Sequence, residues 1–300
     1  MTMKKRKTIR SSLSTRSSTA KSFLDTSAVY KLGVGTTVHQ EYLSKAIPKE
    51  WYVNNYVQME FYRTCLMHWI QLYFESEDAI HQTFGDALKL YAEGFGREAK
   101  AAVNAIASME TGGLSFSLPK DKEFCRQALQ DTIFILAIQF RDTYTNMGQD
   151  PAHCARVPHP LRLSDHVDRD ELLLRVFDDF KAEKECRSRC TIHRLFENEP
   201  YKTKMEAISK LPPTGKSKHA LERIQEAITT AQKAPPDITC RSCGKMGDAV
   251  IATSLDKLWK LHSMDEVHGL ISVALGLEHQ IHLSAKALQK QNDSATSAAE

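Results

Sequence analysis

The 300-residue chain contains no apolar run long enough to cross a membrane, so a membrane-spanning protein is not expected. Its first 21 residues contain no Asp or Glu, and no apolar segment of the kind found in secretory signals follows them. The seven cysteines are an odd number, which does not suggest a disulfide framework. Together these absences predict a cytoplasmic protein without a membrane partner.

The motifs of several common ligand classes are incomplete. Residues 214–217 read TGKS, the end of a phosphate-binding loop, but Lys210 occupies the position of the first glycine and two prolines precede the motif. Residues 94–96 read GFG without the third glycine of a dinucleotide fingerprint, and the 12 histidines do not have the spacing of a zinc protease. Four of them are therefore predicted to be surface or packing residues: His262, His268, His279 and His282.

Positive charge is concentrated at the N-terminus. Residues 1–21 hold seven Lys or Arg, and removing these from the totals of 40 basic and 37 acidic residues leaves the remainder with a formal charge of −4. Residues 1–20 are predicted to be a disordered basic tail, with a nucleic-acid-binding arm as the alternative. The polar residues 286–300 are predicted to be a second disordered tail.

Two segments at opposite ends of the chain place acids beside short apolar elements. Residues 22–32 read SFLDTSAVYKL, a strand followed by Asp25, two hydroxyl residues and an apolar turn. Residues 247–252 read GDAVIA, which predicts a buried helix with Asp248 in its first turn, and residues 259–265 read WKLHSMD, a short strand closed by Asp265. Because open α/β sheets bind ligands at the carboxyl ends of their strands, Asp248 and Asp265 can share one site.

These segments together resemble the PIN-domain nucleases. That family opens with a strand ending in Asp-Thr-Ser or Asp-Thr-Asn, and it ends with Gly-Asp-Ala-Ile-Ile-Ala, a spacer, a short strand and a last Asp. The resemblance implies an α/β, three-layer fold with a short parallel sheet within residues 21–285. It covers the two ends of the chain, and approximately residues 78–235 are predicted to be a mainly helical insertion that the family does not explain.

The second acid of that family lies early in the helix after the second strand. Residues 51–53 can form this strand, and Asn54 or Asn55 can cap a helix whose apolar residues recur at helical spacing. Glu60 lies in this helix among apolar and aromatic neighbours, where an unpaired carboxylate is costly. The resemblance assigns Glu60 to the site, and an ion pair with Arg63 is the structural alternative.

The resemblance implies that Asp25, Glu60, Asp248 and Asp265 are catalytic residues that bind Mg²⁺ or Mn²⁺. Four carboxylates in a confined site need a compensating cation, and oxygen ligands favour these ions over zinc. Such an ion polarises a phosphodiester and makes hydroxide available near neutral pH. The hydroxyl groups that orient the carboxylates would belong to Thr26, Ser27 and Ser263. The implied activity is metal-dependent hydrolysis of RNA by an endoribonuclease.

Other interpretations stay open. Asp25 alone can be a helix N-cap, and Asp248 alone a first-turn acid that interacts with the helix dipole. The whole chain can be a non-catalytic RNA- or protein-binding scaffold, or a toxin-like nuclease controlled by a regulatory protein partner. The oligomeric state, including a homodimer, is not determined by the sequence.

Two close cysteine pairs are candidates for a structural zinc site. Cys186 and Cys190 form one pair and Cys240 and Cys243 the other, and four thiolates suit tetrahedral Zn²⁺. Free thiols in a reducing compartment are the alternative.

The middle of the chain is predicted to be helical. The expected helices cover residues 78–110, 121–144, 171–184 and 218–233, and the centre of the second can instead be a strand. A loop is expected at residues 148–165, which contain three prolines.

Overall fold

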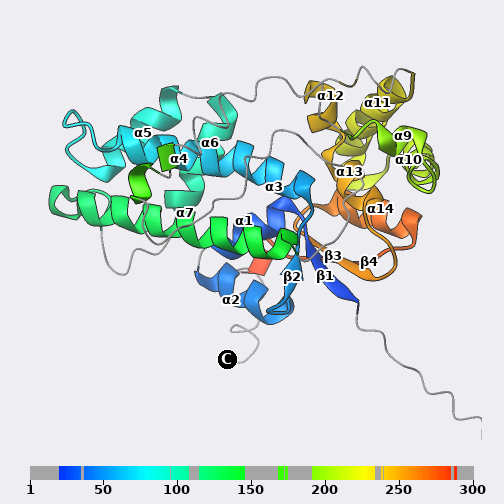
Figure 1. Cartoon of the computed structure of the whole chain (residues 1–300), viewed down its shortest axis with the longest axis horizontal. Helices are drawn as coiled ribbons and strands as arrows, with labels where there is room; N and C mark the ends of the chain where they lie inside the picture. Colours follow the sequence, from blue (N-terminus) through cyan, green and yellow to red (C-terminus); the bar gives the residue numbers. More distant parts are fainter. Residues whose placement is uncertain are drawn as a thin grey trace, which may run out of the picture.

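The computed structural model of the chain describes residues 20–34, 37–94, 96–107, 115–145, 168–171, 173–174, 191–233, 238, 240–284 and 287–288. These residues form an α/β protein that is mostly helical and contains a four-stranded, all-parallel sheet (Figure 1). The expected α/β class and short parallel sheet are therefore confirmed. In the described part of the chain, no helix is both long and apolar enough to span a membrane.

The sheet joins the two ends of the chain. Its strand order is β2-β1-β3-β4, with β1 at Lys21–Leu24, β2 at Trp51–Tyr52, β3 at Trp259–Ser263 and β4 at Glu278–Ile281. Leu24 of β1 is in register with His262 of β3, and the N–H of Asp25 donates to the His262 carbonyl at 3.1 Å. This pairing brings the residues that follow the first strand beside those that follow the third.

Short helices next to the strands carry the acids. The structure forms α1 at Thr26–Val34, α2 at Thr37–Ala46, α3 at Asn55–Phe61, α13 at Gly247–Thr253 and α14 at Glu266–Leu275. As expected, Asn54 caps α3, since its side chain accepts a hydrogen bond from the N–H of Val57 at 2.9 Å. A single π-helical turn, η1 at Tyr62–Leu66, follows α3 and continues into α4 at Met67–Glu75.

Two groups of helices extend from the sheet (Figure 1). One contains α4, α5 at Phe84–Gly94, α6 at Gly96–Ala107, the 3₁₀ turn η2 at Pro119–Asp121 and α7 at Lys122–Thr145. The other contains α9 at Arg194–Glu197, α10 at Tyr201–Ser209, the 3₁₀ turn η3 at Gly215–Ser217, α11 at Lys218–Lys233 and α12 at Cys240–Lys245. The helix predicted at 218–233 is confirmed, and α7 shows that the strand alternative for the second predicted helix is wrong.

The prediction of one continuous helix over 78–110 is wrong. Residues 76–83 form turns, and α5 begins at Phe84. A reciprocal pair of hydrogen bonds sets this start: the N–H of Asp86 donates to the Thr83 hydroxyl at 3.0 Å, and the N–H of Thr83 donates to the Asp86 carboxylate at 2.9 Å. Local side-chain chemistry therefore gives the helix a later start than apolar spacing alone predicted.

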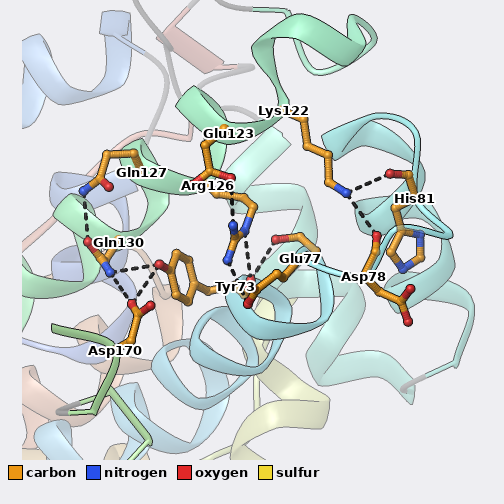
Figure 2. Close-up of polar contacts among 11 residues, drawn as sticks. Tyr73, Glu77, Asp78, His81, Lys122, Glu123, Arg126, Gln127, Gln130 and Asp170 are labelled. Atoms are coloured by element: carbon orange, nitrogen blue, oxygen red, sulfur yellow. Dashed lines mark hydrogen bonds and ion pairs between the residues drawn. The ribbon is translucent and has the colours of Figure 1, made fainter. Parts of the chain in front are cut away.

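A polar network attaches α7 to α4 and to the turn that follows α4 (Figure 2). The buried Arg126 guanidinium lies 4.7 Å from the centre of the Tyr73 ring and bonds the Glu123 carboxylate at 2.8 Å. Gln130 donates to the Tyr73 hydroxyl at 3.0 Å and to Asp170 at 2.7 Å. Because α4 continues α3 through η1, this network packs α7 against the same continuous helical segment, α3-η1-α4, that contains Glu60.

Several predicted segments lie outside the described residues. These are residues 1–19 of the basic tail, the loop at 148–165, most of the helix at 171–184, and the C-terminal tail apart from residues 287–288.

Candidate active site

A cavity of about 420 Å³ contains all four predicted acids in its lining. Asp25 directly follows β1, Glu60 is in α3, Asp248 is in the first turn of α13, and Asp265 is the N-cap residue of α14 after β3. The other lining residues are Thr26, Ser27, Tyr30, Thr64, Cys65, Ile251 and His268. Four separate elements thus deliver carboxyl groups to one space.

Asp25 is both a helix cap and part of the cavity wall. Its buried carboxylate accepts hydrogen bonds from the N–H of Ala28 at 2.8 Å, the Ser27 hydroxyl at 2.9 Å and the Ser263 hydroxyl at 2.6 Å. Burial raises the pKa of Asp25, although His268 and these hydrogen bonds act in the opposite direction. Capping therefore does not exclude Asp25 from the site, since the same side chain also lines the cavity.

Glu60 is oriented by one hydroxyl and by the absence of a side chain opposite it. The Thr26 hydroxyl donates to the Glu60 carboxylate at 2.6 Å. A Cβ atom on Gly247 would lie only 2.5 Å from Glu60 Oε1, so glycine provides the space that the carboxylate occupies. Burial, together with Asp248 and Asp25, raises the pKa of Glu60 to about 7. In the described part of the chain Glu60 has no ion pair with Arg63, the structural alternative.

His268 lies between two of the acids. Its Nε2 atom is 3.2 Å from Asp248 Oδ1 and 3.4 Å from Asp25 Oδ2, and its side chain is buried. Burial lowers the pKa of His268, but the acids outweigh burial and raise it to about 9. For Asp248, burial acts to raise the pKa of the carboxyl. The neighbouring His268 outweighs burial, so the pKa of Asp248 is lowered.

His268 was predicted to be a surface or packing residue, because the histidines have no metal-binding spacing in the sequence. Its position in the cavity was therefore not predicted. One signal was available: His268 follows Asp265 by three residues, a spacing that puts both on one side of a helical turn if a helix begins after Asp265, as α14 does.

Asp265 is linked to Asp25 through Ser263. The N–H of Asp265 donates to the Ser263 hydroxyl at 2.9 Å, and this hydroxyl donates to Asp25. The Ser27 hydroxyl accepts from the N–H of Met264 at 3.0 Å. Although Asp265 is open to solvent, partial desolvation and the charges of Asp25 and Asp248 raise its pKa to about 6. Each predicted orienting hydroxyl thus contacts a carboxylate of the cavity.

The predicted zinc ligands lie largely outside the described residues. This applies to Cys186 and Cys190, and to the side chain of Cys240 at the start of α12. Cys243 is buried, and its sulfur lies 3.7 Å from the Tyr56 hydroxyl, which donates to the Cys243 carbonyl at 2.9 Å. The contact attaches α12 to α3 shortly before Asp248, and the zinc site stays a prediction.

The chemistry of the cavity suits a divalent cation. Among the described residues, no three His, Cys, Asp or Glu side chains already form a metal-ligand cluster. However, a single imidazole lies at ion-pair distance from only two of the four carboxylates, Asp25 and Asp248, and the pKa values of Glu60 and Asp265 are raised partly by repulsion from their acidic neighbours. Carboxylate oxygens are the ligands preferred by Mg²⁺ and Mn²⁺, and either ion would relieve this repulsion.

Comparisons of the chain with protein-family models, with curated proteins and with solved structures find no match.

Proposed function

We propose that this chain is a metal-dependent endoribonuclease with a PIN-like domain at residues 21–285 and a helical insertion at approximately 78–235. The observation that carries the proposal is the convergence of Asp25, Glu60, Asp248 and Asp265 on one cavity. Asp25 and Asp265 follow the carboxyl ends of neighbouring parallel strands, the usual place for a ligand in an open α/β sheet. The assignment of RNA as the substrate comes from the resemblance to the PIN-domain nucleases.

The other nucleophiles in the cavity are poorly suited to catalysis. Burial raises the pKa of the Cys65 thiol to about 12, so the thiol stays protonated near neutral pH. The Thr26 hydroxyl donates its proton to a hydrogen bond with Glu60, and the Ser27 hydroxyl donates to Asp25, so both hydroxyls already serve to orient carboxylates. The arrangement therefore favours direct attack by water over a covalent intermediate on the enzyme.

The four carboxylates would hold Mg²⁺ or Mn²⁺, which supplies a water of lowered pKa and stabilises negative charge on a phosphodiester. Thr26 orients Glu60, and Ser27 and Ser263 orient Asp25. Thr26 and Ser27 lie in the first turn of α1 shortly after β1, and Ser263 is the last residue of β3, so the paired strands set the positions of these hydroxyls. The protein thus contributes a pre-arranged set of oxygen donors on a rigid scaffold.

The test is a cleavage assay on mixed single-stranded RNA and DNA with Mn²⁺, Mg²⁺ or EDTA. Asp25→Asn and Asp248→Asn are each expected to reduce metal-dependent RNA cleavage at least about 100-fold, because each removes a charged ligand. Both variants should stay folded, since asparagine keeps the size of the side chain and one oxygen acceptor.

Glu226→Gln is the matched control, because Glu226 is an exposed residue of α11. It should cleave like the wild type. Undiminished cleavage by Asp248→Asn, in protein free of contaminating nuclease, would overturn the mechanism. Metal-independent RNA binding without cleavage by the wild type would instead identify a non-catalytic scaffold.

A further inference from the structure

His268 contacts carboxylates that come from opposite ends of the chain. Its Nε2 atom lies within ion-pair distance of Asp25 after β1 and of Asp248 in α13, and its ring is fully buried. Neither ring nitrogen makes a hydrogen bond of good geometry among the described residues, so Nε2 lies in close polar contact with the two acids without a directed hydrogen bond to either. The ring is therefore placed by its contacts with the two acids rather than by bonds to other neighbours.

The position of the ring is set by regular structure. The N–H of His268 donates to the Asp265 carbonyl at 3.1 Å, so the histidine lies in the first turn of α14, directly after the last acid. The next residue, Gly269, lets α14 approach β4, because a Cβ there would lie 3.3 Å from Ile281 Cγ1. A side chain on a helix packed against the sheet has little freedom to follow movements of the carboxylates.

We propose that His268 is a positioning residue that sets the separation of the Asp25 and Asp248 carboxylates. A single ring nitrogen in close polar contact with both acids holds them near it, whereas two carboxylates without such a contact repel each other and move apart. The catalytic consequence rests on the proposed function. The positioning itself does not, because it concerns contacts within the folded protein.

A histidine that only fills space would show the same burial, so the test must separate the polar contact with the acids from packing. His268→Gln keeps an N–H donor near the place of Nε2, and His268→Leu removes the donor while retaining much of the volume. His39→Leu is the control for removing a buried histidine: His39 bonds the Leu283 carbonyl at 3.0 Å and does not line the cavity.

The first measurements are the kcat and KM for single-stranded RNA, and Mn²⁺ binding followed by electron paramagnetic resonance. For His268→Leu we expect Mn²⁺ affinity or kcat to fall by about 10–100-fold, the range found for groups that orient metal ligands. The KM for RNA should change little. His268→Gln should recover most of the loss, and His39→Leu should leave Mn²⁺ affinity unchanged.

Wild-type Mn²⁺ binding and kcat in His268→Leu would overturn the proposal, as would tighter Mn²⁺ binding or a His268→Gln variant no better than His268→Leu. If the wild type cleaves no RNA, the proposed function fails, and positioning is judged by Mn²⁺ affinity and thermal unfolding. The melting-temperature shifts of His268→Leu and Asp248→Asn should then be non-additive in the double variant, because the two side chains interact. Additive shifts would refute the positioning role.

Discussion

Replacing Gly247 with alanine is expected to displace Glu60 while leaving the fold intact. The added Cβ would lie 2.5 Å from Glu60 Oε1 and 3.1 Å from the Tyr56 hydroxyl. Non-bonded heavy atoms prefer a separation of roughly 3.5 Å, so the carboxylate must move by about 1 Å. This movement competes with the 2.6 Å hydrogen bond from Thr26. The carboxylate is the end of a flexible side chain, which makes its displacement cheaper than a movement of the backbone.

The effect on activity should greatly exceed the effect on stability. Misplacement of a catalytic group by about 1 Å can cost roughly 100-fold in rate. Gly247 begins α13, and alanine favours a helix by up to about 1 kcal/mol relative to glycine, which offsets part of the steric cost. We therefore expect a rate loss of about 100-fold at saturating Mn²⁺, with the melting temperature close to that of the wild type.

The assay is single-turnover cleavage of RNA, with thermal unfolding of the same samples. Gly244→Ala is the matched control, because a Cβ on this residue of α12 would meet no atom within 4 Å. It should cleave at the wild-type rate. Wild-type cleavage by Gly247→Ala, or an equal loss in both variants, would refute the assignment of Gly247 as the residue that makes room for Glu60.

Three further predictions test other parts of the protein. In metal-free protein, the pKa of Glu60 is raised from 4.5 to about 7, so its contribution to stability is greatest below the lower value and is lost as pH rises through the higher one. The melting temperature of the wild type should therefore fall between about pH 5 and 8, and Glu60→Gln should make this fall smaller. A fall of the same size in Glu60→Gln would contradict the raised pKa. Arg126→Met should lower the free energy of unfolding by about 1–3 kcal/mol in urea titrations without changing kcat, since it weakens only the attachment of α7. If the paired cysteines bind zinc, elemental analysis should find about one zinc per chain and less in Cys240→Ser, whereas purified protein that contains no zinc would exclude the site.

Local sequence patterns predicted the elements whose signals lie within a few residues. The α11 helix has the predicted bounds because its apolar residues recur at helical spacing. The strand after α13 was identified from its apolar residues and the acid that closes it. By contrast, β4 was not predicted: residues 278–281 read EHQI, a polar segment that becomes a strand by pairing with β3.

The sequence by itself determined which acids, hydroxyls and caps are present, because these depend on residue identity and on neighbours along the chain. Only the tertiary structure decided that the four acids line one cavity, since this requires β1 to pair with β3 from the other end of the chain. The same pairing places His268 between Asp25 and Asp248, and the packing of α13 against α3 gives Gly247 its close approach to Glu60. The contacts of His268 with Asp25 and of Gly247 with Glu60 join residues about 190 to 240 apart, and neither helical nor strand periodicity reports on a contact at that range.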